Sequence, residues 1–230
     1  QDCLDSWKKH LPSYEIILWD TKRFNIHEVP WVEQAFNTKK YAFAADYIRL
    51  YALYHHGGIY LDSDVEILKS LDNFLELPYF VGAETSGTIE AAILGAEKGC
   101  DWIKCCLDYY EGRNFIREDG SYDIRMLPEI LNETILRLKP VINMPSGSNI
   151  DDLKKKDLGE AVYVLPKEYF SPKVFDSREV FLTPETHAIH HYQNSWFSHK
   201  AFAYYRTRTL FIKIFGYKAV RSLEKMLLKR

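Results

Sequence analysis

Short apolar runs along the chain predict β-strands, and they alternate with longer segments that favour helix. The predicted strands are residues 14–19, 59–61, 79–81, 91–94, 162–165 and 188–192. The predicted helices are residues 39–56, 101–110 and 128–138, and polar, irregular stretches at 111–126 and 143–160 predict loops. Strands that alternate with helices indicate an α/β layered domain with a mostly parallel central sheet.

The helix predicted at residues 39–56 leads into the most informative part of the sequence. Ala, Leu and Ile favour helix there, and no Gly or Pro interrupts it. A glycine pair at 57–58 ends the helix, because glycine readily takes the left-handed conformation of a helix cap. The short apolar strand 59–61 follows, and Asp62 and Asp64 stand at its exit.

Asp62 and Asp64 are carboxylates at spacing i, i+2, so their side chains can converge on one ligand. Mg²⁺ and Mn²⁺ take oxygen ligands, commonly one or two carboxylates together with phosphate oxygens and water. The carboxyl ends of strands in open α/β sheets are also where ligands bind. We therefore predict a divalent metal site at this pair. The alternative is an acidic turn with solvated side chains.

On the preceding helix, Asp46 and Arg49 lie at spacing i, i+3 on one face. They either belong to the same site or form an intrahelical salt bridge. Two other classes with a similar acidic motif are excluded. A haloacid-dehalogenase-type phosphatase needs Thr or Val where Glu66 stands, and an EF-hand needs Gly and Glu where Ile67 and Asn73 stand.

The composition is that of one ordinary globular domain. The chain has 230 residues, 47% of them apolar, and a formal net charge of −2, so nucleic acid is not an expected partner. Four cysteines, among them the adjacent Cys105 and Cys106, show no zinc spacing and favour a reducing compartment. No apolar run of about 18 residues predicts a membrane span. The one sequon, at Asn132, lies in a predicted helix and is weak evidence for a lumenal location.

Residues 200–230 differ from the rest in charge. They carry nine Lys or Arg and one acidic residue, interleaved with aromatic and aliphatic side chains. This pattern predicts one or two basic amphipathic helices, broken near Gly216, that can lie on an anionic membrane. The alternative is a helix packed on the domain with a solvated basic face. We expect residues 1–199 to form the domain and residues 200–230 to form this tail.

The stretch Tyr41–Glu66, which reads YAFAADYIRLYALYHHGGIYLDSDVE, resembles the DXD-containing sugar-binding region of glycosyltransferase family 32. That family includes bacterial capsular polysaccharide transferases and yeast Golgi mannosyltransferases, and a related arrangement occurs in large clostridial glucosylating toxins. Residues 7–19, 89–99 and 165–170 are similar to further family segments, and His190 to Trp196 is similar to its closing His…Ser-Trp element. The resemblance covers roughly residues 4 to 197.

The resemblance implies a GT-A-like (Rossmann-like) fold, a nucleotide-sugar donor, Mn²⁺ or Mg²⁺, and retention of anomeric configuration. It implies that Asp64 is the principal metal ligand and that Asp62 contacts the metal or the donor ribose. Asp46 and Arg49 match the pair that holds the donor sugar and diphosphate.

Near the end of the matched region, His191 is the better of two adjacent histidines for a metal contact, with a hydrogen-bonded strand histidine as the alternative. Ser195 and Trp196 match a flap over the pyrophosphate. No nucleophile is named by the resemblance; Glu84 and Glu90 are candidates to contact sugar or acceptor, against surface carboxylates. Family members usually begin with a strand that helps to bind the base, and this sequence begins after that point.

We therefore expect a retaining hexosyltransferase that uses a UDP- or GDP-sugar and a saccharide or lipid-linked acceptor, in capsular or surface polysaccharide synthesis. The alternative is a catalytically silent carbohydrate-binding protein with the same fold. A metal-dependent phosphohydrolase is disfavoured by the missing phosphatase residues. We expect the protein in the cytoplasm, peripheral on the inner face of a bacterial membrane through residues 200–230. The Golgi lumen is the alternative.

Overall fold

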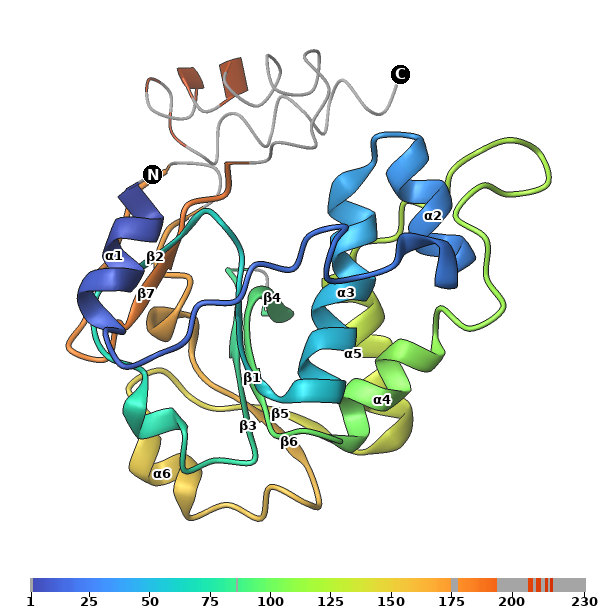
Figure 1. Ribbon diagram of the computed structural model, residues 1–230. Coiled ribbons are helices and arrows are strands. Elements are labelled where there is room, and N and C mark those ends of the chain that lie inside the picture. Colours follow the sequence, from blue (N-terminus) through green and yellow to red (C-terminus); the bar gives the residue numbers. More distant parts are fainter. Residues whose placement is uncertain are drawn as a thin grey trace.

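The computed structural model describes residues 2–85, 87–174 and 178–193, together with residues 207, 208, 210, 211, 214 and 216. A three-stranded sheet runs through the centre of the molecule, between a layer of helices and a smaller lobe (Figure 1). Its strands are β1 (Gly58–Leu61), β3 (Tyr79–Ala83) and β4 (Ile89–Ala96), in the order β1-β4-β3. Every residue of β3 and β4 is buried, as expected for strands covered on both faces.

The helical layer lies against one face of this sheet (Figure 1). It consists of α2 (Pro30–Asn37), α3 (Tyr41–His56), α4 (Asp101–Asp108) and α5 (Leu127–Leu138). The largest buried side chains in this layer are Trp31 and Trp102. Burial of such rings contributes much of the hydrophobic stabilisation of a domain.

The smaller lobe covers the other face. It contains α1 (Asp2–His10), the antiparallel pair β2 (Val65–Ile67) and β7 (Ala188–His190), and α6 (Ile150–Lys154). The remaining elements are η1 (Ile26–Glu28), η2 (Asp72–Phe74), η3 (Lys167–Tyr169) and the parallel pair β5 (Val141–Asn143) and β6 (Val162–Val164). Within the lobe, Nε1 of Trp7 in α1 donates a 2.7 Å hydrogen bond to the carbonyl of Val65 in β2.

Successive side chains of the central strands contribute alternately to two hydrophobic cores. Tyr79 and Val81 of β3 pack with the helical layer, whereas Phe80 between them packs with the lobe. Successive side chains of a strand point to opposite faces, so a strand between two layers needs apolar residues at every position. This explains why the apolar runs in the sequence are continuous.

The α/β class and most predicted elements are confirmed, but the mostly parallel sheet is wrong. β4 pairs antiparallel with both β1 and β3. β3 and β4 are joined by residues 84–88 only, and such a short connection reverses the chain and makes the pair antiparallel. Among the described residues, parallel pairing is confined to β5–β6 and the bridge between Gly82 and Leu165.

The strand predicted at residues 14–19 is also wrong, because that segment forms no element of regular structure. It lies at the surface, with Ile16 and Leu18 49% and 77% exposed.

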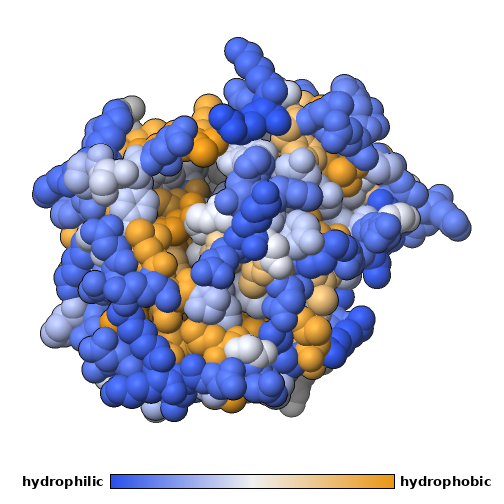
Figure 2. All heavy atoms as spheres, turned by 60° about the horizontal axis from the view of Figure 1, so that its bottom comes forward, coloured by the Kyte–Doolittle hydropathy of each residue, from blue (hydrophilic) through white to orange (hydrophobic). Residues whose placement is uncertain are grey.

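The underside of the molecule is hollowed, and apolar residues gather in the hollow (Figure 2). The loop predicted at residues 143–160 contains α6, whose Asn149 cap and Asp152 form a capping box.

The tail predicted at residues 200–230 lies mostly outside the described residues, so its predicted amphipathic helices stay a prediction. Of the six positions that are described there, Leu210, Phe211 and Ile214 are exposed apolar residues. Within the described part of the chain, no helix combines the length and the apolar character that a membrane crossing needs.

Candidate functional site

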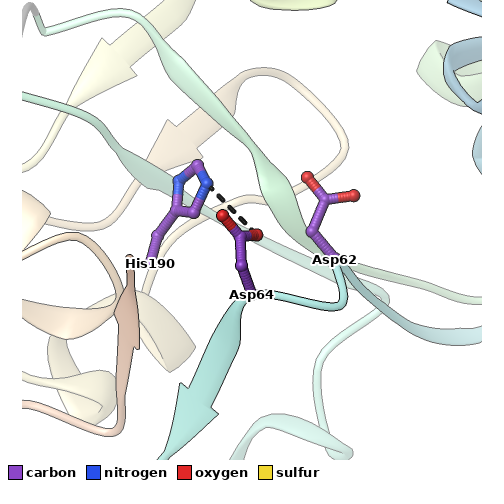
Figure 3. Close-up of side chains that lie close together, drawn as sticks. All are labelled: Asp62, Asp64 and His190. Carbon is purple, nitrogen blue, oxygen red and sulfur yellow. Dashed lines mark ion pairs between the residues drawn. The ribbon is translucent and has the colours of Figure 1, made fainter. Parts of the chain in front are cut away.

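The site is built where the chain leaves β1. The backbone N–H of Asp62 still donates to Ala92 of β4 at 2.9 Å, and a turn closed by Val65 N–H to the Asp62 carbonyl then begins β2. β2 pairs with β7, with Val65 opposite His190. The side chains of Asp62, Asp64 and His190 therefore converge although 128 positions separate the first from the last (Figure 3).

The three side chains form a donor set that fits a divalent cation. One ligand atom from each of Asp62, Asp64 and His190 lies within 4.8 Å of the others, and all three residues are half-buried. Nε2 of His190 lies 3.6 Å from Oδ1 of Asp64. Two carboxylates and one imidazole suit Mn²⁺ and related divalent cations and leave coordination positions for phosphate oxygens.

His190 joins this group, rather than the predicted His191. Nε2 of His191 lies 2.8 Å from Oε2 of Glu66, and its Nδ1 lies 3.3 Å from Nζ of Lys173. Adjacent residues at the end of β7 face opposite sides of the strand, so only one of the two histidines can face Asp64. The sequence did not reveal which one, because the facing depends on the register of β7 on β2.

Arg49 connects α3 to this site, and its guanidinium lies between two carboxylates. Nη2 lies 3.1 Å from Oδ1 of Asp46 and 3.3 Å from Oδ1 of Asp62, and Nη1 lies 3.4 Å from Oδ2 of Asp62. Nη1 also donates to the carbonyl of Ala91 at 2.7 Å, and Nε donates to that of Ala45 at 3.5 Å. Each guanidinium nitrogen thus has a protein acceptor. Arg49 holds Asp46 and Asp62 in place, and its contact with a diphosphate stays a prediction.

The pKa values of Asp46 and Arg49 depend on burial and on the charges around them. Burial raises the pKa of Asp46 to about 7, with Asp62 adding to the rise and Arg49 opposing it. Burial alone would lower the pKa of Arg49, but Asp62, Tyr60 and Asp46 together raise it above its ordinary value. The arginine therefore stays charged, whereas Asp46 changes its protonation near neutral pH.

Tyr60 belongs to the site although the sequence analysis did not select it. Its hydroxyl donates a 2.6 Å hydrogen bond to Oδ1 of Asp62, and the guanidinium carbon of Arg49 lies 4.6 Å from the centre of its ring. Tyr60 lies in β1, and Asp62 follows two positions later, where its N–H still pairs with β4, so both side chains share one face. That spacing is the signal that could have identified it.

Glu90 lies behind His190, in the interior. It is 3% exposed, and Oε1 accepts a hydrogen bond from the N–H of Ala92 at 2.9 Å. Oε2 receives three donors: Ser171 Oγ at 2.5 Å, His190 Nδ1 at 3.1 Å and Tyr192 OH at 3.4 Å. Burial raises the pKa of Glu90, but the charge of His190 and these hydrogen bonds outweigh it and lower the pKa to about 2.

The other predicted residues lie elsewhere. Glu84 stands at the exit of β3 and receives a hydrogen bond from the Thr88 hydroxyl. A role of either Glu84 or Glu90 in contacting sugar or acceptor stays a prediction, and the buried contacts of Glu90 are with protein groups. Ser195 and Trp196, predicted to cover the pyrophosphate, lie outside the described residues.

Part of the chain is similar in sequence to a known family. Residues 1–81 match the family described as "Glycosyltransferase sugar-binding region containing DXD motif". This part of the chain, which carries Asp46, Arg49, Asp62 and Asp64, is therefore a DXD-containing sugar-binding region of the glycosyltransferase family 32 type, as the resemblance implied.

Individual relatives resemble the chain over less than half of its length. Inositol phosphoceramide mannosyltransferase 3 of Schizosaccharomyces pombe is 34% identical over 38% of this chain and 26% of its own. A mannosyl phosphorylinositol ceramide synthase of Saccharomyces cerevisiae is 33% identical over 42% of this chain and 25% of its own. The chain thus spans about a quarter of the length of these curated relatives. The solved structure of PaToxG glycosyltransferase has a TM-score of 0.37 and 20% identity over 52% of this chain and 44% of its own.

Proposed function

We propose that this chain binds a nucleotide sugar and a divalent cation, and forms the donor site of a retaining hexosyltransferase with a GT-A-like fold. The observation that carries the proposal is the convergence of Asp62, Asp64 and His190 within 4.8 Å, beside the buried Arg49. The match of residues 1–81 to a DXD sugar-binding region supports it independently. Asp62, Asp64 and His190 would hold the cation.

The chemistry follows from the residues around that point. A divalent cation bound there supplies Lewis acidity that stabilises the charge developing on a diphosphate leaving group. Tyr60 and Arg49 hold the two oxygens of Asp62 in fixed positions, so the carboxylate needs little reorganisation to act as a ligand. Asp46 faces the same group from α3 and can accept a hydrogen bond from a donor-sugar hydroxyl.

Mannose is the first donor sugar to test. Two of the relatives are named an inositol phosphoceramide mannosyltransferase and a mannosyl phosphorylinositol ceramide synthase. The acceptor panel therefore includes inositol phospholipids together with the saccharides of capsular and surface polysaccharides. A GDP- or UDP-linked hexose and a lipid-linked or free saccharide complete the proposed reaction.

Donor turnover tests the proposal. The chain is incubated with Mn²⁺ and a panel of UDP- and GDP-sugars, and the release of sugar and nucleoside diphosphate is followed with and without acceptor. Release or transfer with one donor supports the proposal, and the anomeric configuration of the product, read by NMR, tests retention. A folded chain that binds no donor would instead support the silent carbohydrate-binding alternative, and release of orthophosphate would indicate a phosphohydrolase.

Replacement of the second aspartate tests the metal ligands. Asp64→Ala should abolish transfer and Mn²⁺-dependent donor binding, while the circular dichroism spectrum and the melting temperature stay close to those of the wild type. Ser63→Ala, in the same turn, serves as the matched control and should keep donor binding. Undiminished activity of a folded Asp64→Ala protein contradicts the assignment.

The location of the protein in the cell is also part of the proposal. Peripheral contact with the inner face of a bacterial membrane through residues 200–230 is supported by the basic composition there and by exposed Leu210, Phe211 and Ile214. The four cysteines are free, which favours the cytoplasm over the Golgi lumen. Asn132, in the sequon, uses its Nδ2 to donate to the Pro128 carbonyl within α5. Sedimentation with anionic liposomes, with and without residues 200–230, tests the contact; equal sedimentation of both forms contradicts it.

A further inference from the structure

We propose that Glu90 is a positioning residue of the cation site, acting through His190. The inference rests on the proposed function only in that a cation binds beside Asp64. Glu90 fixes which nitrogen of the His190 ring carries the proton, and it thereby leaves Nε2 free to bind the cation.

The two nitrogens of His190 face different partners. Nδ1 lies 3.1 Å from Oε2 of Glu90, whereas Nε2 lies 3.6 Å from Oδ1 of Asp64. A carboxylate only accepts hydrogen bonds, so the nitrogen that faces Glu90 must carry a proton. When the ring is neutral, the lone pair is then on Nε2, on the side of Asp62 and Asp64. Metal-binding histidines commonly donate their second N–H to such a carboxylate.

Glu90 itself is held firmly. Its Oε1 accepts from the backbone N–H of Ala92, and its Oε2 accepts from the hydroxyl of Ser171, which is fully buried. β4, which carries Glu90, lies in the middle of the central sheet and is buried along its whole length. The central sheet therefore orients His190 on β7, although β7 belongs to the separate β2–β7 pair.

The same geometry predicts what an amide would do in place of the carboxylate. In Glu90→Gln, the backbone N–H of Ala92 still requires an acceptor, so the amide oxygen takes the place of Oε1. The amide nitrogen then takes the place of Oε2, where it can donate to His190 Nδ1 and to the Ser171 hydroxyl. These buried groups keep partners, and only the longer 3.4 Å contact of the Tyr192 hydroxyl with Oε2 loses its acceptor, so the variant should fold. The neutral His190 ring then carries its proton on Nε2, and this nitrogen can no longer bind the cation.

A second glutamate–histidine pair provides a matched control. His191, the residue after His190, has its Nε2 2.8 Å from Oε2 of Glu66. His191 does not belong to the group formed by Asp62, Asp64 and His190, and its two ring nitrogens contact Glu66 and Lys173 instead. Glu66→Gln makes the same chemical change next to a histidine that faces elsewhere, so it should leave cation binding unchanged.

The experiment measures Mn²⁺ affinity by calorimetry, without donor or acceptor. Glu90→Gln should weaken Mn²⁺ binding by roughly 10- to 100-fold, the range found when such supporting partners are removed from metal sites. Glu66→Gln should bind as the wild type does. In the His190→Ala background, adding Glu90→Gln should cause no further loss, because Glu90 acts through that ring.

Histidine ¹⁵N NMR of the metal-free protein, at a pH where His190 is neutral, gives a second readout. The wild type should show the Nδ1–H form of His190, and Glu90→Gln should show the Nε2–H form. Equal Mn²⁺ affinity of wild type and Glu90→Gln, a further loss in the His190→Ala background, or an unchanged tautomer overturns the inference. A wild-type protein that binds no Mn²⁺ contradicts the proposed function instead, and the tautomer then decides the inference alone.

Discussion

Arg49 contacts both carboxylate oxygens of Asp62, with Nη1 3.4 Å from Oδ2 and Nη2 3.3 Å from Oδ1. The Arg49 side chain is 6% exposed, and Asp46 contacts its guanidinium from the same helix. A planar guanidinium that meets both oxygens fixes the plane of the carboxylate as well as its position. The sugar-binding motif therefore depends on a residue of α3 for its geometry.

Removal of this arginine should destabilise the protein. Arg49→Met leaves Asp46 and Asp62, which are largely buried, without a positive partner, and loss of one member of a buried pair costs about 3–5 kcal/mol. Because Asp62 is 28% exposed, we expect the lower end of that range. Urea unfolding at neutral pH measures it. Arg137→Met, at an arginine whose side chain is 75% exposed, is the control, and an equal loss in both variants contradicts this role.

The hydroxyl of Tyr60 should matter separately from its ring. Tyr60→Phe removes the 2.6 Å hydrogen bond to Asp62 but keeps the ring beside the guanidinium of Arg49. Loss of a hydrogen bond to a charged group costs about 1.5–3 kcal/mol when buried, and about 1 kcal/mol is expected at this half-buried site. Thermal unfolding measures the stability, and Mn²⁺ titration should show weaker binding. Unchanged values of both would show that the hydroxyl is dispensable.

The turn from α3 to β1 should require glycine at one position. Gly57 has φ 71° and ψ −170°, a combination open essentially only to glycine, and a Cβ there would lie 2.8 Å from the backbone nitrogen of Lys98. Gly57→Ala should lower the free energy of unfolding by at least about 1–3 kcal/mol. Gly159→Ala, where a Cβ meets only the flexible side chain of Asp157, should stay within about 0.5 kcal/mol of the wild type.

Glu90 should give the protein a measurable acid dependence. Its pKa is lowered from 4.5 to about 2 in the folded state, so its stabilisation is present above pH 4.5 and is lost as the pH falls toward 2. Over that interval the wild type should lose up to about 3 kcal/mol more unfolding free energy than Glu90→Gln. Denaturant unfolding at several acidic pH values measures the difference. The exposed Glu15→Gln is the control, and it should follow the wild-type profile.

Short-range sequence patterns were enough to predict the part of the site that lies between Asp46 and Asp64. The glycine pair after α3, the short apolar strand and the two aspartates at its exit are neighbours in sequence, so helix and strand periodicity place them correctly. The spacing of Asp46 and Arg49 likewise puts them on one face of α3. The family resemblance over this region is confirmed, because all of it lies within residues 1–81.

Elements that depend on distant partners were not predictable in the same way. Residues 14–19 have the composition of a buried strand, yet they form no strand, since composition does not supply a neighbouring strand to pair with. The direction of the central sheet likewise depends on which strands become neighbours, and β4 lies antiparallel between β1 and β3.

The sequence by itself determined the DXD turn, the helix that supports it and their resemblance to a sugar-binding region. Only the tertiary structure decided that His190, rather than His191, faces Asp64, and that Glu90 lies behind it. The physical reason is strand register. A shift of one residue turns every side chain of β7 to the other face, and that register is set by pairing with β2, more than 100 residues earlier in the chain.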